Sequence, residues 1–278
     1  MVRLFGPLVG LFFVVALLWS LVSGVIAYVS DPPKPTVEHE FYKHAKELHL
    51  ASDGPMGHFD NQQLQRGFQV YKEVCAACHS MRLVSFGDLT GIGYTPGQTK
   101  TIAAEWSTET PSINPDTGEA ATRKSVTSDK FPAPFANEVA ARAANNNALP
   151  PDLSLITKAR EGGAAYIYSL LTGFQDPPAN LPKDSRPAEG LHYNPYFANL
   201  NLSMAPPLTG DGQVTYGEGA PKPTVDQMAK DVSAFLIWTA EPKLENRHRA
   251  GVATLVFLLI FAGLCWGSYK SIWANKEH

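Results

Sequence analysis

The segment Cys75-Ala76-Ala77-Cys78-His79 holds the side chains of this sequence with the clearest potential for chemistry. Its spacing is the C-x-x-C-H pattern of c-type haem attachment. Two thiols on one helical turn can add across the two vinyl groups of a haem, and the histidine that follows then lies beneath the iron as its proximal ligand. The pattern therefore predicts one haem c, held covalently by Cys75 and Cys78 and axially by His79.

Two other uses of paired cysteines fit this chain less well. Structural zinc needs two further ligands at a fitting spacing, and the sequence has neither a second C-x-x-C pair nor a paired histidine cluster. A redox dithiol stands at the start of a helix, whereas residues 62–74 predict an amphipathic helix that leads into the cysteines. The remaining cysteine, Cys265, lies in an apolar run, so three cysteines do not provide a disulfide framework.

The sixth iron ligand decides between an electron carrier and an open iron that binds small molecules. Among five methionines and eight histidines, Met204 is the first candidate, because the prolines at 206 and 207 fix the backbone beside it. His192 is the second candidate. A lone methionine is more often core filler, so a self-contained haem enzyme or gas sensor with an open sixth position stays an alternative.

Two long uncharged runs flank the candidate haem segment. Residues 4–30 would form a helix of about 40 Å, which exceeds the roughly 30 Å of a bilayer core. Residues 250–269 are followed by Lys270 and Trp273, a basic and aromatic border typical of a membrane interface. We expect a transmembrane helix or uncleaved signal anchor in 1–30, a haem domain in 31–248, and a C-terminal anchor with a short tail in 249–278. A signal peptide cleaved before Tyr28 is the alternative for the first run.

Positive charge alone does not decide the orientation of the chain in the membrane, because the basic residues on the two sides are nearly equal in number. Arg3, Lys270 and Lys276 place both termini in the cytoplasm, but Arg247 and Arg249 oppose this assignment from the other end of the second run. Haem attachment to c-type cytochromes takes place outside the cytoplasm, which implies a periplasmic position for residues 31–248 and cytoplasmic termini.

Composition predicts a loop-rich, mainly α domain with little sheet. The chain has 22 glycines and 22 prolines among 278 residues, which favours long loops between a few helices. The net charge is -3, and acidic residues outnumber Lys and Arg between the two apolar runs. This charge argues against a nucleic-acid partner and allows docking of a basic protein.

Seven segments together resemble the cytochrome c1 family, the haem-c subunits of the cytochrome bc1 complex. The resemblance covers about residues 60–275 and is specific to this family rather than to cytochromes at large. The segments are residues 66–71 (RGFQVY), 141–146 (ARAANN), 148–154 (ALPPDLS), 168–173 (YSLLTG), 193–197 (YNPYF), 204–207 (MAPP) and 240–242 (AEP).

The resemblance implies a fold similar to class I c-type cytochromes, with long loop insertions and membrane anchors. It also implies specific roles around the haem. Cys75 and Cys78 would form the thioethers, and His79 and Met204 would be the axial ligands. Arg160 and Tyr166 match positions near the haem propionates, where a guanidinium fork suits a carboxylate. Asn145 and Pro151 lie in matching segments and would contact the haem. Asn147 departs from the family pattern, which usually has glycine there.

The function implied by the resemblance is electron transfer within a bacterial quinol–cytochrome c oxidoreductase. The enzyme would be the proton-translocating complex, and this chain an electron carrier that accepts from the Rieske iron-sulfur protein and donates to a soluble or membrane-tethered cytochrome c. The implied partners are cytochrome b, those two proteins and the lipid of the inner membrane, with the whole complex a dimer. A membrane-tethered cytochrome that acts alone, without cytochrome b, is a second alternative. The acids Glu105, Glu109, Asp116 and Glu119 could steer a basic carrier.

Overall fold

The computed structural model describes residues 2–32 and 35–274, which divide into two units, residues 1–41 and 42–278. The first unit contains α1 (Val2–Ser30) and the short α2 (Val37–Phe41). In α1, residues 5–30 are long and apolar enough to cross a membrane, and their side chains are exposed. The expected N-terminal apolar helix is therefore present.

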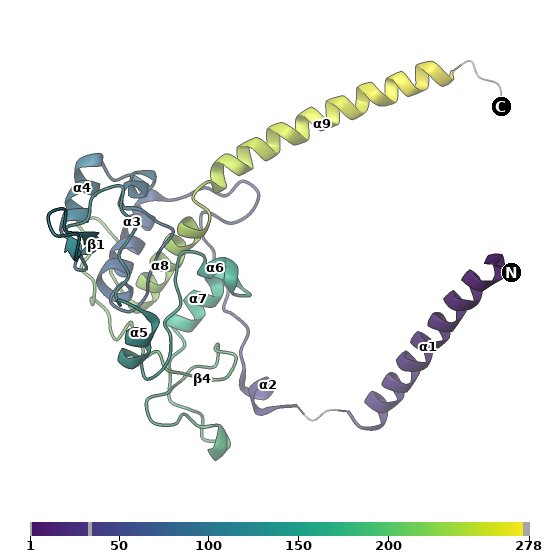
Figure 1. Ribbon diagram of the computed structural model, residues 1–278, viewed down its shortest axis with the longest axis horizontal. Helices are drawn as coiled ribbons and strands as arrows, with labels where there is room; N and C mark the ends of the chain where they lie inside the picture. Colours follow the sequence, from purple (N-terminus) through teal and green to yellow (C-terminus); the bar gives the residue numbers. More distant parts are fainter. Residues whose placement is uncertain (1, 33–34, 275–278) are drawn as a thin grey trace. The chain divides into compact units, whose positions relative to one another are not determined.

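The second unit begins at Tyr42 and contains the candidate haem segment (Figure 1). Its elements are α3 (Asn61–Val70), the π-helical turn η1 (Tyr71–Cys75), the 3-10 helix η2 (Phe86–Ile92), α4 (Pro96–Ala104), β1 (Thr110–Ile113), β2 (Ala120–Arg123), α5 (Glu138–Ala144), α6 (Ile156–Ala159), α7 (Gly163–Leu171), the 3-10 helix η3 (Lys183–Ser185), β3 (His192–Tyr193), β4 (Asn201–Leu202), α8 (Val225–Ala240) and α9 (Leu244–Trp273).

Sheet is limited to two small antiparallel pairs in the described part of the chain. In the first pair Thr110 lies opposite Arg123, and in the second His192 lies opposite Leu202. Long irregular segments connect the short helices, as the glycine and proline content predicts. The prediction of a mainly α domain with long loops and apolar anchor helices is confirmed.

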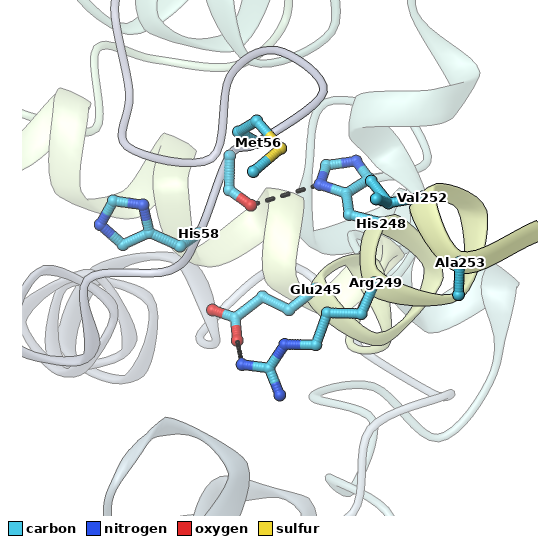
Figure 2. A pocket seen from close by; sticks show the side chains of 8 residues that line it. Met56, His58, Glu245, His248, Arg249, Val252 and Ala253 are labelled. Atoms are coloured by element: carbon cyan, nitrogen blue, oxygen red, sulfur yellow. Dashed lines mark hydrogen bonds and ion pairs between the residues drawn. The ribbon is translucent and has the colours of Figure 1, made fainter. Parts of the chain in front are cut away.

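Helix α9 leaves the helical domain directly after α8 and is also long and apolar enough to span a membrane. Its first turns are held by the loop of residues 51–59. The Phe59 amide donates to Glu245 Oε1 over 2.8 Å, and His248 Nδ1 lies 3.3 Å from the Gly57 carbonyl oxygen. Figure 2 shows the contact between His248 and this loop. The base of the anchor is thus attached to the domain, whereas its apolar portion is exposed.

Helices α3 and α8 cross at the centre of the domain, and Gly67 permits their close approach. A Cβ atom added at Gly67 would lie 2.0 Å from the Asp231 carbonyl oxygen and 2.7 Å from Phe235 Cβ. Leu64 and Phe68 of α3 are buried on the same face. Backbone contact between the two helices fixes the direction of α3, which leads into the haem segment.

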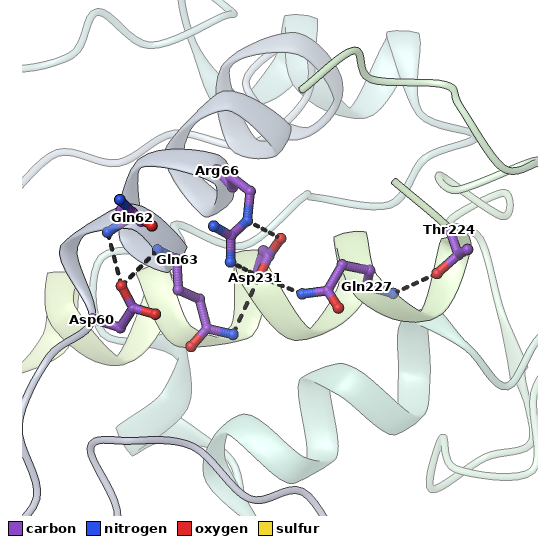
Figure 3. A network of polar contacts seen from close by, with 7 residues as sticks. All are labelled: Asp60, Gln62, Gln63, Arg66, Thr224, Gln227 and Asp231. Atoms are coloured by element: carbon purple, nitrogen blue, oxygen red, sulfur yellow. Dashed lines mark hydrogen bonds and ion pairs between the residues drawn. The ribbon is translucent and has the colours of Figure 1, made fainter. Parts of the chain in front are cut away.

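A polar network adds specificity to this helix crossing (Figure 3). Asp231 on α8 is fully buried, and its carboxylate accepts from Arg66 Nε at 2.9 Å. Gln63 and Gln227 also donate to Asp231 Oδ1, at 3.2 Å and 2.9 Å. A buried carboxylate is tolerated because a guanidinium and two amides bind it.

Candidate haem site

The haem segment follows a local change in helix type. Asp60 caps α3, since its side chain accepts from the Gln62 amide. The sequence predicts a helix over 62–74, and the α-helix instead ends at Val70 and continues as a π-helical turn to Cys75. The Ala76 amide donates to the Tyr71 carbonyl over 2.8 Å, the five-residue span of a π turn. The turn delivers Cys75 and Cys78 at the end of a helix that is packed on α8.

The two cysteines are free thiols with different surroundings. Cys75 is half-buried and Cys78 is exposed. Burial, and secondarily the neighbouring Cys78, raises the pKa of Cys75 to about 12. The Cys75 thiol is therefore neutral near pH 7. The Cys75 carbonyl accepts from the amides of Cys78 and His79 at 3.1 Å and 2.9 Å, which closes the C-x-x-C-H segment into one compact turn.

The imidazole of His79 is oriented by one backbone contact. His79 Nδ1 lies 2.8 Å from the Pro151 carbonyl oxygen. Because a carbonyl only accepts, Nδ1 carries the hydrogen and the lone pair of the neutral ring is on Nε2. Burial lowers the pKa of His79, opposed by the Pro151 hydrogen bond and by Asp152, so the neutral ring is favoured. This is the usual arrangement of a metal-binding histidine, with one ring nitrogen held and the other available.

Asp152 fastens the segment after His79 to the loop that holds the ring. Its Oδ2 accepts from Ser80 Oγ and from the Arg82 amide, both at 2.9 Å, and its Oδ1 accepts from the Ser154 amide at 2.9 Å. Sequence reasoning missed Asp152. The available signal was an aspartate two residues before a serine, the pattern of an Asx turn, directly after Pro151.

Both candidates for the sixth ligand lie on the same short ribbon. His192 is in β3 and pairs with Leu202 of β4, and Met204 follows β4 by two residues. Both side chains are half-buried. The assignment of Met204 over His192 stays a prediction.

The predicted propionate partners are neighbours of each other. Arg160 is exposed, and Tyr166 is half-buried on α7. Burial raises the pKa of Tyr166, and the Arg160 guanidinium beside its hydroxyl opposes that rise. The structure brings these two side chains together, as a shared carboxylate partner would require.

The asparagines at the end of α5 adopt unusual backbone conformations. Asn145 Nδ2 donates to the Ala141 carbonyl over 2.7 Å and so caps the helix. Asn146 and Asn147 have φ values of 49° and 62°, in the left-handed region. Asparagine tolerates a positive φ better than most residues other than glycine, which suits it to position 147.

The donor set of this site fits a haem c. Two free thiols three residues apart can bind vinyl groups, and an oriented neutral imidazole can bind iron. Met204, whose thioether is half-buried, stays the predicted second ligand. The helical domain, its apolar anchors and this donor set define the class of membrane-anchored haem proteins.

Comparisons with known proteins place the chain more closely. The model of the Cytochrome C1 family matches residues 50–276. Cytochrome c1 1, heme protein, mitochondrial, of Arabidopsis thaliana is 43% identical over 257 residues, which span 92% of this chain and 80% of that protein. Cytochrome c1 of Rhodospirillum rubrum is 41% identical over 237 residues, 81% of this chain and 86% of that protein. The chain belongs to the cytochrome c1 family, the electron-transfer haem subunits of the cytochrome bc1 complex.

One bacterial relative is a longer protein. Cytochrome b/c1 of Bradyrhizobium diazoefficiens is 43% identical over 245 residues, which span 81% of this chain and 35% of that protein. Its name joins cytochrome b and cytochrome c1.

Proposed function

We propose that this chain carries one covalent haem c and passes single electrons from the Rieske iron-sulfur protein to a cytochrome c. Cys75 and Cys78 form the thioether bonds, His79 Nε2 is the proximal ligand and Met204 is the distal one. The observation that carries this proposal is the 2.8 Å contact of His79 Nδ1 with the Pro151 carbonyl, because it leaves Nε2 free and directs the ring.

The residues around the site act by position and polarity. When bound, the haem supplies a one-electron redox centre. Pro151 and Asp152 keep the imidazole and the following loop in place. Arg160 and Tyr166 provide a cation and a hydroxyl for propionate carboxylates. Asn145 lies at the end of α5 and contacts the haem edge in this proposal.

We infer that the chain assembles with cytochrome b, as the joined name of the Bradyrhizobium protein suggests for that protein. The complex, as a dimer, would be the quinol–cytochrome c oxidoreductase. The β1–β2 hairpin is acidic, and the acids at its surface are Glu109, Asp116 and Glu119, with Glu105 just before it. A basic cytochrome c would be attracted to these carboxylates, and its electron-transfer rate would then fall as ionic strength rises. A rate insensitive to salt contradicts this docking surface.

The proposed location is the inner membrane of a bacterium, with residues 31–248 in the periplasm. The segments 1–30 and 249–278 would be the anchors, with both termini in the cytoplasm. Protease added to intact spheroplasts would then cut within 31–248 and leave a C-terminal tag on residue 278 protected. Mass spectrometry of the mature N-terminus tests whether residues 1–30 are retained.

Absorption spectroscopy tests the ligand assignment. Oxidised wild-type protein is expected to show the methionine-to-iron charge-transfer band, and Met204→Leu is expected to lose it and to bind carbon monoxide when reduced. His192→Leu is the matched control, because it changes the other candidate on the same ribbon and keeps the band. A band that survives in Met204→Leu would reopen the assignment towards His192, and a wild type that binds carbon monoxide readily would favour an open-site haem enzyme.

A further inference from the structure

A cavity of about 490 Å³ lies where α9 leaves the helical domain, and no residue of the haem segment lines it (Figure 2). It is formed between the loop of residues 51–59 and the first turns of α9. The lining residues are Met56, Gly57, His58, Glu245, His248, Arg249, Val252 and Ala253.

The polar part of the cavity contains an exposed cation that is only loosely paired. The Arg249 side chain is 79% exposed and forms a loose i,i+4 ion pair with Glu245, whose Oε2 is 3.8 Å away, too far for a hydrogen bond (Figure 2). The other oxygen of Glu245 accepts from the Phe59 amide, and His248 contacts the Gly57 carbonyl. These groups are engaged with the loop, whereas the guanidinium retains donors for a ligand.

The other part of the cavity is apolar and continues along the same side of α9. Val252 lies three residues after Arg249, and Ala253 follows, so both lie one turn further along the helix from the cation. Met56 of the loop is 79% exposed and adds a flexible apolar side chain. The lining therefore changes from cationic to apolar within one helical turn.

This change coincides with the border between water and membrane. Arg249 is the last charged residue before an uncharged run that extends from residue 250 to residue 269. A ligand that fits must carry an anionic group at the border and an apolar tail that continues into the hydrocarbon. We propose that the cavity binds one phospholipid, with its phosphate on Arg249 and the start of an acyl chain along Val252 and Ala253. The proposal depends on the membrane anchor and is independent of the haem assignments.

Photo-crosslinking of the assembled complex tests the proposal. The complex is placed in nanodiscs of phosphatidylcholine with a minor fraction of a phosphatidylglycerol that carries a diazirine near the glycerol. Peptide mapping of the wild type is expected to find the adduct on residues 51–59 or 245–253. Arg249→Gln should reduce labelling about fivefold, the effect of one basic side chain near an anionic lipid surface. Arg247→Gln is the matched control, since Arg247 pairs with Glu241 and does not line the cavity, and the substitution removes the same charge two residues earlier on α9.

A second pair of variants tests the cavity itself. Ala253→Phe blocks the apolar part of the cavity without a change of charge and should strongly reduce the adduct. Thr254→Phe places the same aromatic side chain at an exposed neighbour outside the lining and should not. An unchanged haem spectrum in both variants shows that the domain is folded.

Several outcomes would overturn the proposal. Equal labelling of Arg249→Gln and Arg247→Gln removes the role of the cation, and equal labelling of the two phenylalanine variants removes the role of the cavity. Displacement of the adduct by millimolar inorganic phosphate means an anion site that needs no lipid. An adduct on the detergent-solubilised chain that is absent from the assembled complex means that another subunit occupies the cavity.

Discussion

Replacement of Asp152 should loosen the proximal side of the haem site more than it loosens the rest of the domain. The Asp152 carboxylate accepts hydrogen bonds from Ser80 Oγ and from the amides of Arg82 and Ser154. Its contact with the Arg82 guanidinium adds little, because that side chain is 75% exposed. Three hydrogen bonds to a mostly buried carboxylate contribute about 1 kcal/mol each, so Asp152→Ala should cost about 3 kcal/mol and Asp152→Asn about half of that.

The same carboxylate gives a defined dependence on pH. Burial alone would raise the pKa of Asp152, but the hydrogen bonds from Ser154, Arg82 and Ser80 outweigh it and lower the pKa from the ordinary 3.8. The pKa of Asp152 is lower in the folded state than in the unfolded state. The contribution of its carboxylate to stability is therefore complete above the unfolded pKa and is lost as the pH falls through the folded pKa. The acid side of the stability profile should therefore be shallower in Asp152→Ala than in the wild type.

Asp129→Ala provides the matched control. Asp129 binds Arg123 at 2.5 Å and 2.8 Å and the Val126 amide at 2.9 Å, and its side chain is 14% exposed against 17% for Asp152. Urea titration of the detergent-solubilised chain should show destabilisation in both variants. Only Asp152→Ala should raise the pH at which the haem becomes high-spin on acidification, because only Asp152 is linked to the His79 loop. Equal shifts of that transition in the two variants would refute the positioning role of Asp152.

Two further predictions concern the crossing of α3 and α8. Gly67→Ala should cost more than about 3 kcal/mol, because its Cβ would overlap the backbone of Asp231. Gly97→Ala in α4 is the control, since its Cβ would meet only Thr95 Oγ1 at 3.9 Å, and it should be neutral or stabilising. Thermal unfolding measured by circular dichroism compares the two variants. Asp231→Leu should cost about 3–5 kcal/mol, because Arg66 loses its buried partner. The double variant Arg66→Met/Asp231→Leu should recover most of that loss in the same measurement. An equally unstable double variant would contradict the assignment of the loss to an unpaired charge.

The sequence was most informative where a local pattern carries its own chemistry. The C-x-x-C-H spacing, the two apolar runs and the loop-rich mainly α architecture were all readable from residue types and periods. The candidates Arg160 and Tyr166 came from resemblance, and the structure brings them together. The unusual residue Asn147 was noted in the sequence, but its positive φ is visible only in the fold.

Long-range polar contacts were not predictable in the same way. Asp152 contacts Ser80 across 72 residues of chain, and Asp231 contacts Arg66 across 165. No local period relates such positions, and a surface aspartate and a buried one look alike in a single sequence. The cavity at the base of α9 was missed for the same reason, since it is formed by residues 56–58 and 245–253.

The π turn explains how one helix supports both the core and the candidate haem site. In a straight α-helix Cys75 would lie within about 40° of Tyr71 around the helix axis and would share its buried face. The extra residue in a π turn changes that direction by up to about 100°. Tyr71 accordingly stays 1% exposed among Trp106, Phe131 and Phe235, while Cys75 is half-buried. The local departure from α geometry therefore leaves Cys75 at the edge of the core rather than inside it, and Cys78, three residues on, is exposed.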